Sequence, residues 1–134
     1  QVILTDGQVI DTVIHGLATP LQAFPGQVAA IGMLLVQTLC NFVIPSGSGQ
    51  AYVTMPIMAP IADLTGLSRQ VAVLAYQFGD GFTNMVVPTN ALLMGMLALA
   101  RIPYHCWLRF VAPLLLKLYV VAVVLLVVAV RIGY

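Results

Sequence analysis

The chain alternates long apolar stretches with short polar breaks, and the lengths of the apolar stretches predict membrane helices. Residues 28–44 are apolar except for three polar side chains near their end, and as a helix they would rise about 26 Å. Residues 110–130 are apolar except for Lys117 and are long enough to cross a hydrocarbon core of about 30 Å. The pattern predicts an all-α integral membrane chain.

The first break is a polar, glycine-rich stretch at residues 41–50, which reads Asn-Phe-Val-Ile-Pro-Ser-Gly-Ser-Gly-Gln. It carries no charge, and apolar sequence flanks it on both sides. Irregular backbone at membrane depth is tolerated only where protein buries it or where it lines a cavity. We therefore predict a re-entrant helical hairpin over residues 27–62, with residues 41–50 as a non-helical tip. A flexible serine–glycine linker is the alternative.

The second break lies in a predicted discontinuous transmembrane helix over residues 69–101. Apolar sequence stops at Gly-Asp-Gly-Phe-Thr-Asn, residues 79–84, and Pro-Thr-Asn at residues 88–90 interrupts it again. We expect a half-helix, an unwound stretch over residues 79–84 and a second half-helix. Two broken segments close together in sequence point to a binding site near the bilayer midplane.

The remaining stretches are predicted to connect or support this core. Residues 1–22 would form a short interfacial helix, and residues 23–104 would carry the transport site. Residues 101–109 indicate a polar loop whose Tyr104 and Trp107 anchor the chain at the membrane surface. Residues 105–134 would then form a final transmembrane helix that acts as a scaffold.

A polar turn separates the hairpin from the discontinuous helix. Asp63 and Arg69 flank this turn and are expected to face water or to pair with each other. Ser68 precedes an apolar run and is a candidate N-cap for the next helix. We assign no chemistry to this turn.

Composition supports a membrane protein and gives no sign of nucleic-acid binding. The chain is 61% hydrophobic and 7% charged, whereas soluble domains have about 25% charged residues. Its net charge of +1 offers no basic field for a phosphate backbone. The two cysteines have neither metal-binding nor disulfide spacing. The acidic residues are all aspartates, at positions Asp6, Asp11, Asp63 and Asp80.

Asp80 is the acidic residue that we expect to lie deep in the membrane, where ionisable side chains usually serve function. It can carry a coupling proton, ligate a cation or pair with a cationic substrate. A structural role, as a helix cap or as a partner for a missing segment, is the alternative. Neutral oxygens of the kind that an alkali cation needs are offered nearby by Thr83, Asn84, Thr89 and Asn90.

The predicted tip offers a different chemistry. Gly47 and Gly49 allow close approach to the backbone, and N–H groups at the start of the following helix can receive an anion. Ser46 and Ser48 add hydroxyls that serve either an anion or a cation. Two polar residues of the incoming segment receive different roles. We assign Asn41 to the site and Gln37 to hydrogen bonding between helices.

Four runs of sequence resemble the C-terminal part of the YfcC-like membrane proteins, which are grouped with the anaerobic four-carbon dicarboxylate carrier (DcuC) family in the wider ion-transporter superfamily. They are residues 41–50, Thr-Met-Pro-Ile-Met-Ala-Pro at 54–60, residues 69–84 and Val-Pro-Thr at 87–89. The likeness extends over roughly residues 1–115. It implies one half of an inverted-repeat transporter, with a scaffold domain and a mobile transport domain.

The resemblance also implies a function, a location and partners. It suggests a secondary active, ion-coupled transporter of small carboxylates, C4-dicarboxylates by the family name, in a bacterial inner membrane. A basic amino acid antiporter of the arginine/ornithine type and a non-transporting membrane fragment are the alternatives. The coupling ion would be Na⁺ or H⁺, without a cofactor. The expected partners are lipid, the small solute, a missing N-terminal half and, as a further option, a second copy of the chain.

The residues and the resemblance together give one predicted substrate and ion site. Its members are Asn41, Ser46, Gly47, Ser48, Gly49, Asp80, Thr83, Asn84, Pro88 and Thr89. A sodium ion would bind near Ser48, Thr83 and Asn84. Asp80 would repel an anionic substrate unless it were protonated or bound to a cation.

Two enzymatic hypotheses fit the sequence poorly. Residues 78–80 approach the Gly-x-Gly-Asp pattern of intramembrane aspartyl proteases, but residue 77 is glutamine and no second deep aspartate is present. A serine hydrolase based on Ser48 lacks a Gly-x-Ser-x-Gly elbow. His15 and His105, the candidate bases, both fall at predicted interfaces. We therefore expect no enzyme.

Overall fold

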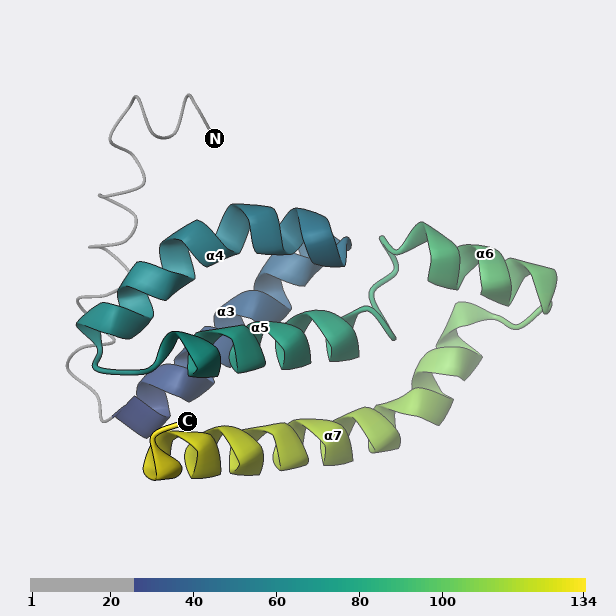
Figure 1. The fold of residues 1–134 in the computed structure, drawn as a ribbon. Coiled ribbons are helices and arrows are strands. Elements are labelled where there is room, and N and C mark those ends of the chain that lie inside the picture. Colours follow the sequence, from purple (N-terminus) through teal and green to yellow (C-terminus); the bar gives the residue numbers. More distant parts are fainter. Residues whose placement is uncertain (1–25) are drawn as a thin grey trace.

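The computed structural model describes residues 26–134, and this part of the chain consists of five helices and their connections (Figure 1). The helices are α3 (Gly26–Val43), α4 (Gly47–Leu64), α5 (Arg69–Thr83), α6 (Ala91–Leu99) and α7 (Tyr104–Ile132). Within these residues the all-α prediction is confirmed. The interfacial helix predicted at residues 1–22 lies outside the described residues.

The core lies where α3, α4, α5 and α7 meet. α5 packs along α3, α4 packs on α5, and α7 contacts both α3 and α5, while α6 contacts only α7 and stands apart in Figure 1. Many core positions hold small residues, which let helix backbones approach closely. Side chains with no exposed surface include Ala29, Ala30, Ile61, Ala75 and Leu126.

The first break is shorter than the sequence predicts. α3 continues through Asn41 to Val43, α4 begins at Gly47, and only residues 44–46 are non-helical. Pro45 lacks a backbone N–H, and Ser46 is extended (φ −139°, ψ 113°), so the chain reverses within three residues. The prediction that residues 47–49 are unwound was wrong, because they form the first turn of α4.

The second break exists but lies further along the chain than predicted. α5 continues through Gly79 and Asp80 to Thr83, and the chain is unwound over residues 84–90. Gly79 lies inside α5, and its lack of a side chain allows α5 to pack closely on α3. A Cβ at this position would lie 2.7 Å from the Cβ of Gln37, so only glycine lets α5 approach α3 this closely.

The polar loop predicted at residues 101–109 is also shorter than expected. α7 begins at Tyr104, with Pro103 at its N-cap, and continues for 29 residues. Trp107 and Arg109 therefore lie in the first turns of a helix. The chain reverses just before it, where Arg101 adopts a positive φ of 56°.

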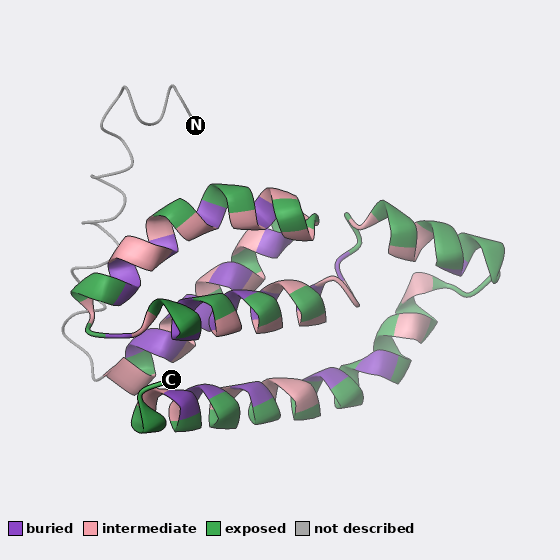
Figure 2. Ribbon diagram, in the orientation of Figure 1, coloured by how far each residue is buried: buried purple, intermediate pink, exposed green. Residues whose placement is uncertain are grey.

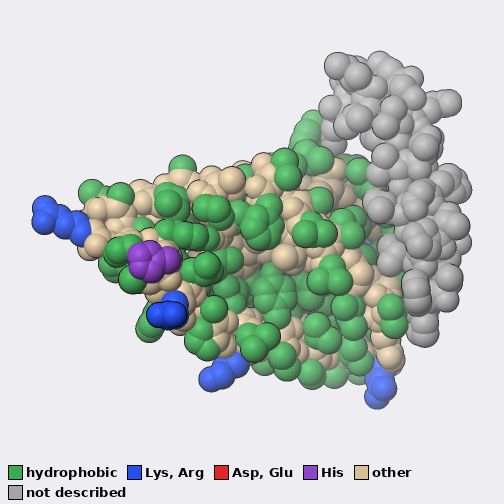
Figure 3. Space-filling model, turned by 180° about the vertical axis from the view of Figure 1, so that it is seen from behind, with side chains coloured by type: hydrophobic (Ala, Val, Ile, Leu, Met, Phe, Trp, Pro, Cys, Tyr) green, Lys and Arg blue, Asp and Glu red, His purple; other side chains and the backbone are tan. Residues whose placement is uncertain are grey.

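Two helices in the described part, α3 and α7, are long and apolar enough to cross a membrane by length and composition. α7 has one buried face toward the other helices and one exposed face (Figure 2). Figure 3 shows hydrophobic side chains spread across the visible face between backbone and other side chains, with lysine and arginine side chains near its margins. Such an extensive apolar surface suits contact with lipid or with further protein. The buried residues of α7 are Val111, Leu115, Ala122, Leu126 and Ala129.

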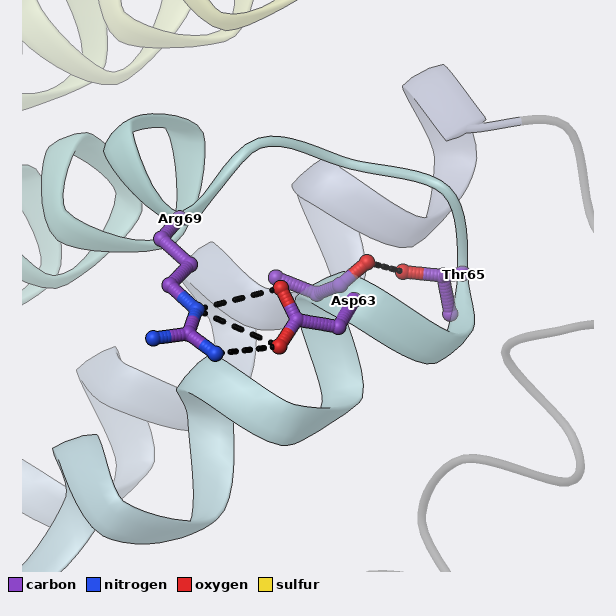
Figure 4. Close-up of polar contacts among 4 residues, drawn as sticks. Asp63, Thr65 and Arg69 are labelled. Atoms are coloured by element: carbon purple, nitrogen blue, oxygen red, sulfur yellow. Dashed lines mark hydrogen bonds and ion pairs between the residues drawn. The ribbon is translucent and has the colours of Figure 1, made fainter.

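An exposed ion pair marks the turn between α4 and α5 (Figure 4). Arg69 Nη2 lies 2.7 Å from Asp63 Oδ2, and the hydrogen bond from Arg69 holds the pKa of Asp63 below its usual range. Ser68 caps α5 by accepting a hydrogen bond from the N–H of Val71 at 3.3 Å. The predicted pairing and the predicted N-cap are both confirmed.

Candidate functional site

Asp80 lies half-buried near the end of α5, and two amides hold one of its carboxylate oxygens. Asn41 Nδ2, from α3, donates to Asp80 Oδ1 at 2.6 Å, and Asn84 Nδ2, from the second break, donates to the same oxygen at 2.9 Å. Asn84 Nδ2 also donates to the Asp80 carbonyl at 3.0 Å. The structure thus brings together Asn41, Asp80 and Asn84, as the sequence predicts.

The second carboxylate oxygen faces the start of α4. A Cβ at Gly47 would lie 3.1 Å from Asp80 Oδ2, so glycine permits this close approach. No donor to Oδ2 is found among residues 26–134. The first N–H groups of a helix lack intrahelical acceptors, and the Ser46 side chain does not cap those of α4. A free acceptor oxygen and uncapped N–H donors therefore lie near each other at Gly47.

Tyr76 fixes the start of α4 on α5. It lies one helical turn before Asp80, and its hydroxyl donates to the Gly47 carbonyl at 2.6 Å. Sequence reasoning missed this residue, although its spacing of four from Asp80 places both side chains on one face of α5. Tyr76 thereby helps set the distance between Asp80 and the α4 N-terminus.

A chain of buried amides links α3 to α4 beside Asp80. Gln50 Nε2 donates to Gln37 Oε1 at 2.8 Å and to the Gln37 carbonyl at 2.9 Å, and Asn41 Nδ2 donates to Gln50 Oε1 at 2.9 Å. All three side chains have no exposed surface. The role of Gln37 in joining helices is confirmed. Gln50 was missed as its partner, although the two amides lie on either side of the break.

Two buried polar atoms of these amides have no hydrogen-bond partner within the described residues. They are Gln37 Nε2, a donor, and Asn41 Oδ1, an acceptor. A buried polar group without a hydrogen bond costs about 1–3 kcal/mol, so a ligand, a water molecule or another part of the protein would be bound favourably there. Asn41 Oδ1 is buried and belongs to the side chain whose nitrogen holds Asp80.

Thr83 and Thr89 make other contacts. The Thr83 hydroxyl, which is buried, lies 3.0 Å from the Tyr119 hydroxyl of α7, and that hydroxyl also lies 3.2 Å from Thr38 Oγ1. Thr89 Oγ1 donates to the Phe42 carbonyl at 3.2 Å, near the end of α3. Tyr119 was not anticipated from the sequence, and it ties α7 to both α3 and α5.

The other predicted site residues lie near the two breaks. Ser46 and Ser48 are exposed at the start of α4, Gly49 follows them, and Pro88 is exposed in the second break. A sodium site formed by Ser48, Thr83 and Asn84 stays a prediction. Within residues 26–134 there is no group of three or more His, Cys, Asp or Glu side chains that would hold a metal ion.

Comparison with known proteins places the chain among membrane carriers. The sequence model of the C4-dicarboxylate anaerobic carrier family, DcuC, matches residues 1–131. The chain is 43% identical over 129 residues to the protein named "Putative basic amino acid antiporter YfcC" of Escherichia coli (strain K12), which covers 96% of this chain and 26% of that protein. It is 35% identical over 130 residues to an uncharacterised protein of Haemophilus influenzae, with coverage of 97% and 25%.

The chain therefore spans about a quarter of the length of these curated relatives. No solved structure matches it. The family match extends over almost the whole chain, and both relatives are bacterial. The chain belongs to the C4-dicarboxylate anaerobic carrier (DcuC) family.

Proposed function

We propose that this chain forms the solute-binding part of a secondary active, ion-coupled carrier, with Asp80 at the centre of its site. The observation that supports this most directly is the asymmetry of the carboxylate. Oδ1 is held by the amides of Asn41 and Asn84, while Oδ2 faces Gly47 without a donor from the described residues. An oriented carboxylate with a free oxygen can bind an ammonium group, a proton or a sodium ion.

An amino acid suits this chemistry better than a C4-dicarboxylate, which reverses the order expected from the family name. Asp80 Oδ2, which receives no donor from the described residues, is an acceptor for a cationic group. The uncapped N–H groups at the start of α4 can receive the carboxylate of the same molecule. One relative is named as a basic amino acid antiporter. We therefore propose a basic amino acid as the first candidate substrate.

A C4-dicarboxylate is the second candidate, because the family is named for it and because the start of α4 can receive a carboxylate. A dicarboxylate would require Asp80 to be protonated or bound to a cation, since two carboxylates would otherwise repel each other. A coupling proton or sodium ion would then bind at Asp80 together with the substrate.

The surrounding architecture is part of this proposal. α3 and α4 would form a re-entrant hairpin whose tip is residues 44–46, in one half of an inverted-repeat carrier. The uncharged tip and the buried amides beside it support this arrangement, because backbone at membrane depth must be enclosed by protein. The carrier would lie in the bacterial inner membrane, together with a further half of the protein and, as an option, a second copy.

The division into a transport part and a scaffold helix at residues 105–134 stays a prediction. Tyr119 of α7 contacts Thr38 of α3 and Thr83 of α5 through its hydroxyl. These contacts cross the predicted boundary, and they favour movement of α7 together with α3 and α5.

Transport by the full-length protein in liposomes tests the proposal. We expect uptake of labelled arginine, driven by arginine or a related amino acid on the opposite side. The same vesicles should be tested with labelled succinate under a sodium gradient and under a proton gradient. Succinate uptake without arginine uptake would replace the first candidate by the second. If neither arginine nor succinate is taken up, the result contradicts both candidates, the basic amino acid and the C4-dicarboxylate.

A further inference from the structure

Two aromatic side chains of α7 donate hydrogen bonds to the backbone of the second break. Trp107 Nε1 donates to the Met85 carbonyl at 2.9 Å, and the Tyr104 hydroxyl donates to the Val86 carbonyl at 2.5 Å. Aromatic residues at these positions were expected to anchor the chain at the membrane surface. That expectation stays a prediction, and their polar atoms reach carbonyls that the end of α5 leaves outside a helix.

The backbone carbonyls on either side of Met85 and Val86 also accept hydrogen bonds. Asn90 Nδ2 donates to the Asn84 carbonyl at 3.3 Å, and the Asn90 N–H donates to the Val87 carbonyl at 3.1 Å. Val87 itself has no exposed surface. Four consecutive carbonyls, at residues 84–87, therefore have donors. Unwound backbone at membrane depth is stable when its polar groups are paired in this way.

The same break sets the geometry of Asp80. Asn84 directly precedes Met85, and its side chain donates to Asp80 Oδ1. Asn90 Nδ2 adds a hydrogen bond to Asn84 Oδ1 at 3.0 Å, which orients the Asn84 amide with its nitrogen toward Asp80. The position of Asn84 thus depends on where the neighbouring carbonyls are held, and α7 supplies two of the donors that hold them.

We propose that Tyr104 and Trp107 are positioning residues for the solute site, acting through the break and Asn84 on the orientation of Asp80. This inference rests on the proposed function, because it assigns these residues to the same site. A purely structural role would instead lower the amount of folded carrier without changing its affinity.

The test uses Tyr104→Phe and Trp107→Phe in the full-length protein in liposomes. Each change removes one donor and keeps an aromatic ring. We expect KM for arginine to rise by up to about fivefold in each variant. One hydrogen bond corresponds to about a fivefold change in an equilibrium, and the part that is coupled to Asp80 reaches KM. The maximal rate per inserted molecule should stay near that of the parent. Tyr134→Phe, which removes a hydroxyl at the opposite end of α7, is the control and should leave KM unchanged.

A double-mutant cycle separates positioning from general stabilisation. In an Asn84→Ser background, where the amide no longer holds Asp80, Tyr104→Phe should raise KM much less than it does in the parent. Equal rises in both backgrounds would overturn the route through Asn84. If Trp107→Phe inserts poorly, Tyr104→Phe decides the matter, because it removes a single oxygen atom.

The outcomes also separate this inference from the proposed function. Parent uptake with unchanged KM in both aromatic variants would overturn the inference and leave the carrier function intact. Absence of uptake by the parent protein, for arginine and for succinate, would overturn the proposed function and the inference with it.

Discussion

Asn41 and Asp80 are separated by 39 positions in the sequence, yet Asn41 Nδ2 lies 2.6 Å from Asp80 Oδ1. This contact joins the end of α3 to the end of α5, at the point where the chain turns into α4. It also orients the carboxylate, because Oδ1 receives the amides and Oδ2 is left toward Gly47.

Asp80→Asn should abolish coupled uptake while the protein still inserts into the membrane. The amide that replaces the carboxylate keeps nearly the same shape but can neither ionise nor bind a cation strongly. Asp63→Asn is the matched control, because Asp63 is exposed in the turn before α5 and should be dispensable. Uptake and membrane content should be measured on the same vesicles. Full activity of the Asp80 variant would exclude a coupling or charge-pairing role.

Gly47→Ala should raise KM, and Gly47→Val should block substrate binding. A Cβ at Gly47 would lie 3.1 Å from Asp80 Oδ2 and would force the carboxylate to move. Gly81→Ala is the matched control, because a Cβ at that position meets nothing within 4 Å. Substrate affinity should be measured for all three variants. An unchanged affinity in Gly47→Val would remove the start of α4 from the site.

Gly79→Ala should destabilise the protein by about 1–3 kcal/mol, as overpacking of a tight interface does. The new methyl group would lie 2.7 Å from Gln37 Cβ and 3.0 Å from the Thr38 nitrogen, so α5 would have to move away from α3. Gly95→Ala, where a Cβ meets nothing within 4 Å, should be neutral or stabilising. Denaturant unfolding in detergent measures the difference. Equal stability of both variants would contradict the close packing of α3 and α5.

Gln50→Leu should destabilise the protein by about 1–3 kcal/mol for each partner that it leaves unpaired. Asn41 would lose its acceptor Gln50 Oε1, and Gln37 Oε1 would lose its donor. Gln77→Leu, at an exposed position of α5, is the control of the same chemistry. Thermal unfolding of the purified proteins compares them. A Gln50 variant as stable as its control would show that the buried amides are not needed for stability.

The sequence by itself determined the class of the protein, the number of breaks in its apolar pattern and several site residues. These features are local. Apolar run lengths indicate membrane helices, Pro45 beside two glycines indicates a break, and an acid such as Asp80 is rare in apolar sequence. Asn41 and Asn84 were predicted as site residues because they lie beside the breaks. The family was equally readable from short runs of residues.

Only the tertiary structure decided where the helices end and which polar atoms meet. Gly79 stays helical because α3 packs against it, and no local signal distinguishes such a glycine from one that breaks a helix. Gln50 finds Gln37 and Asn41 because the turn at residues 44–46 brings α4 back beside α3. The hydrogen bonds that Tyr104 and Trp107 of α7 donate to the second break depend on the angle at which the helices cross. That angle is set by packing between segments far apart in sequence.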